Sequence, residues 1–187
     1  MNTSLENHDY GVAMRYVCVI MVFMVGCAKM SEEELWQKVE EARASNNYDS
    51  TIQVCQTLLK EYPEGKKAPA AAYLLGEVCQ NGKHDFQNAV NYYHAFIKKY
   101  PDLNSTPLAL FIVGFIYNNN LQMMDSARIT YEDFLKRFPD HELATSAKFE
   151  LANLGKSPDE IMGPGVFAKK ERPTDRAQKK LTDRKGK

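Results

Sequence analysis

A repeat of 38 residues restricts, more than any other feature, how this 187-residue chain can fold. Three segments share one pattern and end in proline: TLLKEYP at 57–63, AFIKKYP at 95–101 and DFLKRFP at 133–139. The same shift aligns Gly76 with Gly114 and Tyr93 with Tyr131. A fixed period of this length indicates copies of one supersecondary unit that stack on their neighbours.

Each copy is predicted to contain two helices. In the second copy we expect a first helix at 71–80, a turn at 81–84 and a second helix at 85–100. Apolar residues of the second helix recur every three or four positions, which places them on one face: Ala89, Tyr93, Phe96, Ile97 and Tyr100. Proline then ends the helix, because the residue before proline avoids helical geometry. Ser31 with Glu34 predicts a capping box, and Pro107 suits a first helical turn.

This pattern resembles tetratricopeptide repeats, in which small residues such as Gly76, Gly114 and Ala89 allow close helix contact and a proline closes each unit. The resemblance implies an all-α solenoid of about seven helices at 32–160. Its three helix pairs would cover about 32–63, 69–101 and 106–139, followed by a final helix at 142–154.

An apolar run at 16–26 follows Arg15 and ends in Gly26 and Cys27. As a helix it would rise about 16 Å, well short of the ~30 Å core of a bilayer. A basic residue, a short apolar stretch and small residues are typical of a secretory signal. Because residues 1–13 are polar and acidic, we expect translation to start at Met14.

The tetrapeptide MVGC at 24–27 resembles the bacterial lipobox. The resemblance implies that a signal peptide at 1–26 is removed and that Cys27 carries a lipid, followed by a short linker at 27–31. With Ala28 after the cysteine, it also implies sorting to the outer membrane. An ordinary cleaved signal and an uncleaved anchor remain alternatives.

Charge divides the mature chain into two parts. Residues 31–162 hold 13 Lys/Arg and 19 Asp/Glu, whereas residues 163–187 hold 9 Lys/Arg and 3 Asp/Glu. The basic part begins with Gly-Pro-Gly and has little apolar periodicity, so we expect a disordered tail at 161–187. Its charge would attract anionic lipid or an acidic partner. Nucleic acid is not expected as a partner of an exported chain.

Catalytic patterns are missing from the sequence, which has no phosphate-binding loop, nucleophile elbow or zinc-protease motif. We therefore expect no enzyme activity, no metal or cofactor and no small-molecule substrate. His84, His94 and His141 are expected to be exposed. Cys55 and Cys79 lie on apolar faces and are interpreted as core residues, with a disulfide as the alternative in an exported protein.

A partner-binding groove follows from the tetratricopeptide resemblance, because such arrays bind peptides along the first helix of each unit. The implied positions are Tyr73, Glu77, Gln80, Asn81, Phe111, Phe115, Asn118, Asn119, Phe149 and Asn153. Aromatic rings supply contact area and amides bond an extended backbone. For Tyr73, Phe111 and Phe149, packing between neighbouring units is the favoured alternative. The asparagines at 118–120 favour a turn with left-handed geometry.

A lipobox followed by repeats that end in a basic-aromatic-proline pattern resembles the BamD-type lipoprotein of the outer-membrane β-barrel assembly machinery. The resemblance implies a lipid-anchored, periplasm-facing scaffold at the outer membrane that binds protein or peptide partners, among them a β-barrel assembly protein. Two other roles remain open: a coordinator of cell-wall or division machinery, and a structural subunit of a secretion or gliding apparatus.

Overall fold

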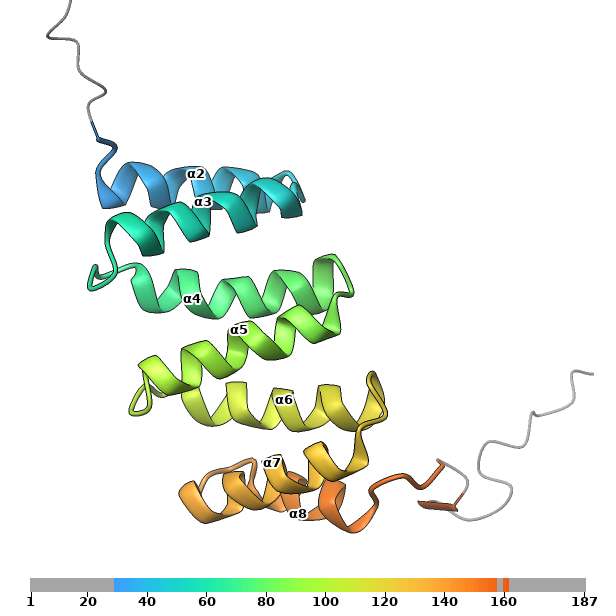
Figure 1. Cartoon of the computed structure of the whole chain (residues 1–187). Coiled ribbons are helices and arrows are strands. Elements are labelled where there is room, and N and C mark those ends of the chain that lie inside the picture. Colours follow the sequence, from blue (N-terminus) through green and yellow to red (C-terminus); the bar gives the residue numbers. More distant parts are fainter. Residues whose placement is uncertain (1–28, 158–159, 162–187) are drawn as a thin grey trace, which may run out of the picture. The chain divides into compact units, whose positions relative to one another are not determined.

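Seven α-helices and a π-helical turn make up the computed structural model, which describes residues 29–157 and 160–161 (Figure 1). In chain order they are α2 (Glu32–Ala44), α3 (Tyr48–Glu61), α4 (Ala68–Glu77), η1 (Val78–Gly82), α5 (Phe86–Lys99), α6 (Thr106–Asn119), α7 (Met124–Arg137) and α8 (Ala144–Ala152). No strand occurs in the described part of the chain. The predicted tetratricopeptide-type, all-α fold of about seven helices is confirmed.

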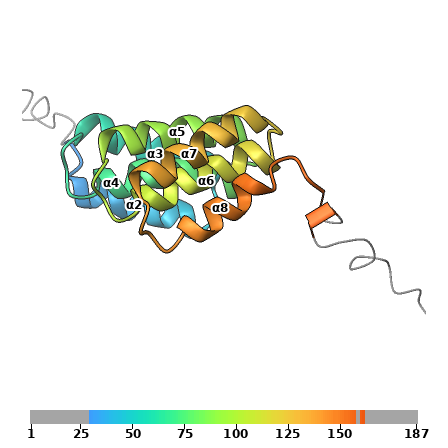
Figure 2. The ribbon, with the colours of Figure 1, turned by 90° about the horizontal axis from the view of Figure 1, so that it is seen from below.

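The chain divides into two compact units between Ala71 and Ala72. In the first unit, α2 packs against α3. In the second unit, α5 packs on α6, α6 on α7 and α7 on α8, which is the neighbour-to-neighbour packing of a helical repeat. Figure 2 shows α5 and α7 along one side of this second unit and α6 and α8 along the other.

The second helices of the three copies keep the 38-residue period to the residue. α3, α5 and α7 begin at Tyr48, Phe86 and Met124, and each contains 14 residues. Two residues before each start, the backbone is left-handed, with φ of 54° at Asn46, 53° at His84 and 54° at Gln122. This conformation costs a non-glycine residue energy, so its recurrence shows that the turn geometry is imposed by the repeat.

The expectation of left-handed geometry within 118–120 is therefore wrong. Asn118 and Asn119 belong to α6, and Asn120 is its C-cap with a φ of −106°. The left-handed residue is Gln122, because the turn places that conformation two residues before α7 begins.

Helix ends differ from expectation in the first helices of the copies. The helix predicted at 71–80 begins three residues earlier, and a π-turn extends it through Asn81 and Gly82, since the Lys83 amide donates to the Val78 carbonyl at 3.0 Å. The final helix is shorter than 142–154 and spans Ala144–Ala152.

The predicted capping box is present at the start of α2, with the Glu34 amide 3.3 Å from Ser31 Oγ and the Ser31 amide 2.7 Å from Glu34 Oε2.

The core of the second unit depends on two glycines. A Cβ atom built on Gly76 would lie 2.7 Å from the ring of Tyr93, and one on Gly114 would lie 2.7 Å from the ring of Tyr131. Both tyrosines are buried, with an exposed fraction of 1% for Tyr93 and 0% for Tyr131. The prediction that these small residues permit close helix contact is confirmed.

Both described cysteines are free thiols in buried positions, so the core interpretation holds and the disulfide alternative is excluded. Burial raises the pKa of the Cys55 thiol to about 12. His84 and His94 are exposed as expected, but His141 is half-buried. Its Nδ1 accepts a hydrogen bond from the Leu143 amide at 3.1 Å, which holds the ring in the turn before α8.

Candidate partner-binding surface

Two of the predicted groove aromatics lie between the two helices of their own copy. The Tyr73 ring on α4 meets the rings of Tyr93 and Phe96 edge-on, with centroids 5.5 and 5.4 Å apart. Phe111 on α6 contacts Tyr131 and Phe134 at 5.7 and 6.1 Å. These contacts lie within a copy, whereas the sequence interpretation had placed them between neighbouring units. Burial, followed by the nearby Glu77 carboxylate, raises the pKa of Tyr73.

Phe149 occupies the same repeat position on α8 but is 54% exposed. Its counterparts Tyr73 and Phe111 pack on rings of α5 and α7, the second helices of their copies. Among the described residues after α8, only Glu160 and Ile161 are helical. The same repeat position is therefore half-buried at Tyr73 and Phe111 and exposed at Phe149.

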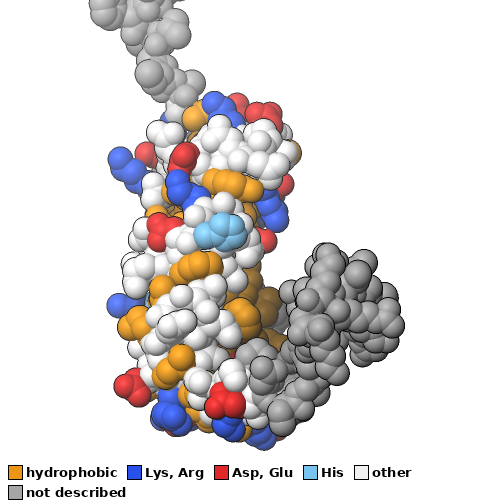
Figure 3. All heavy atoms as spheres, turned by 90° about the vertical axis from the view of Figure 1, so that its right-hand side faces the viewer, with side chains coloured by type: hydrophobic (Ala, Val, Ile, Leu, Met, Phe, Trp, Pro, Cys, Tyr) orange, Lys and Arg blue, Asp and Glu red, His pale blue; other side chains and the backbone are white. Residues whose placement is uncertain are grey.

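α6 contains no charged residue in its 14 positions, yet one of its faces is open to solvent. Leu108 and Phe115 are 42% and 40% exposed, and Asn119 lies one turn beyond Phe115 on the same face. A helix that is apolar all round is normally buried, and an exposed apolar patch marks an interaction site. We call Leu108, Phe115 and Asn119 the α6 stripe. Figure 3 shows hydrophobic side chains, in orange, reaching the surface between polar ones.

Two of the predicted amide side chains already form hydrogen bonds within the second unit. Gln80 Oε1 accepts from the Tyr93 hydroxyl at 3.1 Å. Asn118 Nδ2 donates to Glu150 Oε2 at 3.4 Å, which joins α6 to α8.

The remaining amides lie at helix ends. The Asn119 and Asn153 side chains each donate to a carbonyl four residues earlier, at 3.1 and 2.8 Å. Asn81 is exposed and Glu77 is half-buried. The structure thus brings Asn118 close to α8 and leaves Asn119, beside Phe115, on the surface.

A depression of about 380 Å³ between the turns after α5 and α7 was not foreseen from the sequence. Its lining residues are Pro101, Asp102, Leu103, Asn104, Pro107, Phe138 and His141. One member of each of two aligned aromatic-proline pairs lines it, Pro101 and Phe138, so the recurring pair at the ends of the repeats was the available sequence signal.

Residues 29–157 and 160–161 contain neither a candidate metal cluster nor a membrane-spanning helix. No cluster of three His, Cys, Asp or Glu side chains there could hold a metal ion. Within the same residues, no helix combines the length and apolarity needed to cross a bilayer. Cys27, the predicted signal peptide at 1–26 and, apart from Ile161, the predicted tail at 161–187 lie outside the described residues.

The paired helices, the period and the glycine–tyrosine contacts define an all-helical protein of the tetratricopeptide-repeat type. A family model described as YfiO, outer membrane lipoprotein, matches residues 28–157, and the chain belongs to this family. This is the BamD-type family that the lipobox and the repeats predicted. No curated protein matches the chain.

Proposed function

We propose that this chain is a lipid-anchored scaffold that faces the periplasm at the outer membrane, binds protein or peptide partners and serves outer-membrane protein assembly. Membership of an outer membrane lipoprotein family supports the location. The observation that carries the binding role is the α6 stripe, because a helix without charged residues exposes Leu108 and Phe115 to solvent.

The proposed binding surface comprises the α6 stripe together with Phe149 and the neighbouring amides. Phe149 is 54% exposed and offers an aromatic face without further rearrangement. Tyr73 and Phe111 would contribute mainly by positioning the helices, since each already packs on two rings. The proposal requires no catalysis, cofactor, small-molecule substrate or nucleic acid.

The test is an affinity purification of tagged protein from mildly solubilised native membranes, with mass spectrometry of the recovered proteins. We expect a β-barrel assembly protein in near-equal amount with the wild type and its loss in the variant F115A/N119A. Ile129→Ala is the matched control, because Ile129 on α7 is 66% exposed but lies outside the stripe. Circular dichroism of both variants should match the wild type.

Other recovered proteins would change the function assigned to the surface. Cell-wall enzymes in near-equal amount would favour the coordinator role, and large stoichiometric particles would favour a secretion or gliding apparatus. Equal recovery of the partner with F115A/N119A and with the wild type would contradict the proposed surface.

The anchor is tested separately by Cys27→Ser. The variant should fold but leave the membrane fraction, because the residue that would carry the lipid has lost its thiol. Retention of the variant in membranes after a carbonate wash would contradict the lipid anchor and leave the binding test unaffected.

A further inference from the structure

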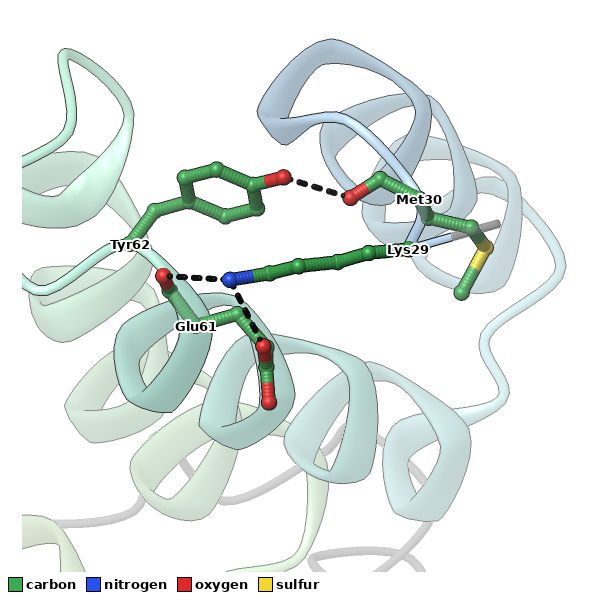
Figure 4. Close-up of polar contacts among 4 residues, drawn as sticks. All are labelled: Lys29, Met30, Glu61 and Tyr62. Carbon is green, nitrogen blue, oxygen red and sulfur yellow. Dashed lines mark hydrogen bonds and ion pairs between the residues drawn. The ribbon is translucent and has the colours of Figure 1, made fainter. Parts of the chain in front are cut away.

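Lys29 and Met30, the first described residues, are held on the end of α3 (Figure 4). Lys29 Nζ lies 2.9 Å from Glu61 Oε2 and donates a hydrogen bond to the Glu61 carbonyl at 3.3 Å. The same ammonium lies 4.7 Å from the centre of the Tyr62 ring. The Tyr62 hydroxyl donates to the Met30 carbonyl at 2.7 Å. We call Lys29, Met30, Glu61 and Tyr62 the linker clamp.

The bonds of Lys29 fit the end of a helix. The last carbonyl groups of α3 have no intrahelical donor, and a cation near the helix C-terminus is favoured by the dipole. Lys29 satisfies both conditions at once. Its hydrogen bond to Glu61 raises the pKa of Lys29, and the same bond lowers the pKa of Glu61, so both groups are charged at neutral pH.

The Tyr62 hydroxyl is not required by the repeat itself. At the equivalent positions, Tyr100 has a buried hydroxyl without a hydrogen-bond partner among the described residues, and Phe138 has no hydroxyl. All three residues cap the second helix of their copy with the same backbone bond. The role of the Tyr62 hydroxyl is therefore to bind the segment that precedes α2, through the Met30 carbonyl.

The start of α2 is tied to the turn that follows α3. Glu32 Oε1 accepts a hydrogen bond from the Lys67 amide at 2.6 Å, and Glu33 pairs with the Lys67 ammonium at 3.6 Å. Together with the linker clamp, these contacts hold residues 29–33 along residues 61–67 of the first unit.

Resting on the proposed lipid anchor at Cys27, we propose that the linker clamp holds the first unit directly against the lipid headgroups. Lys29 is the second residue after Cys27, and these two steps along the chain give a reach of about 7 Å. If the clamp opened, the free linker would extend to Ser31 and its reach would double to about 14 Å. The clamp thus shortens the connection between the lipid and the first unit, and the end of α3 faces the membrane.

Trypsin cleavage after Lys29 tests the clamp independently of the anchor. Tyr62→Phe and Glu61→Gln both keep Lys29 as a cleavage site, and phenylalanine is tolerated at the equivalent Phe138. Because Tyr62→Phe removes one neutral hydrogen bond, we expect cleavage after Lys29 in the full chain to be roughly fivefold faster. Tyr100→Phe is the matched control and should leave the rate unchanged.

Energy transfer tests the membrane position. Trp36 on α2 is the only tryptophan in the sequence, so transfer from Trp36 to a dansyl headgroup in phosphatidylethanolamine–phosphatidylglycerol vesicles reports the height of the first unit. We expect the lipidated E61Q/Y62F variant to show roughly twofold weaker transfer than the wild type, because its linker reach doubles.

Three results would overturn the inference. They are unchanged cleavage in E61Q/Y62F, faster cleavage with unchanged energy transfer, and an equal effect of Tyr100→Phe. If the wild type itself fails to bind vesicles, the lipid anchor has failed, and the clamp proposal that rests on it falls as well. The cleavage assay would still report whether the four residues form the clamp.

Discussion

Removing one hydroxyl from either of two equivalent tyrosines should change stability in opposite directions. Tyr93 and Tyr131 are 38 residues apart, and both rings are packed against a glycine. The Tyr93 hydroxyl donates to Gln80 at 3.1 Å, whereas the Tyr131 hydroxyl is buried without a hydrogen-bond partner among the described residues. The substitution to phenylalanine keeps the ring in both cases, so the comparison isolates the hydroxyl.

The expected magnitudes follow from these two environments. Tyr93→Phe loses one hydrogen bond and should lower the free energy of unfolding by about 1 kcal/mol. Tyr131→Phe removes a buried unsatisfied hydroxyl, whose desolvation costs about 1–3 kcal/mol, and should raise the free energy of unfolding by about 1 kcal/mol. The two variants should therefore differ by about 2 kcal/mol.

Urea unfolding followed by circular dichroism at 222 nm measures this difference, with tryptophan fluorescence as a second probe of cooperativity. The midpoints should shift in opposite directions at an unchanged slope. A Tyr131→Phe variant that is less stable than the wild type by about 1 kcal/mol would refute the reasoning, because it would mean that the hydroxyl has a partner.

Three further predictions concern the core. Gly114→Ala should destabilise the protein by about 1–2 kcal/mol in the same urea assay, since the clash with Tyr131 outweighs the ~1 kcal/mol gain in helix propensity; an unchanged midpoint would show that the ring can move aside. Cys55, with its pKa raised to about 12, should resist alkylation at pH 8 until urea unfolds the chain; prompt labelling of the native protein would contradict its burial. Burial raises the pKa of Tyr93 and Tyr131 above 10.0, so unfolding releases their protons and stability should fall as pH rises past 10.0. Urea midpoints between pH 9 and 11 check this, and a midpoint that stays level would contradict it.

The sequence by itself determined the repeat, its second helices and its glycine contacts. Apolar spacings of three and four, the capping box at Ser31 and the proline after each second helix are local signals. α5 accordingly begins and ends within one residue of the predicted 85–100. The π-turn at Val78–Gly82 escaped prediction because no residue pattern marks such a turn. His84 is of a residue type that enters the left-handed region more often than most, but the predicted turn at 81–84 did not specify which residue would do so.

Only the tertiary structure decided which of the predicted site residues are available to a partner. Tyr73, Phe111 and Phe149 are indistinguishable in the repeat alignment, yet two are packed on rings and one is 54% exposed. The difference lies in the rings of α5 and α7, which pack on Tyr73 and Phe111. The pairing of Lys29 with Glu61 was likewise decided by the tertiary structure. The two residues are 32 positions apart, and an ion pair leaves no local pattern in the sequence. Periodicity encodes which face of a helix is apolar, whereas the folded chain sets what lies opposite that face.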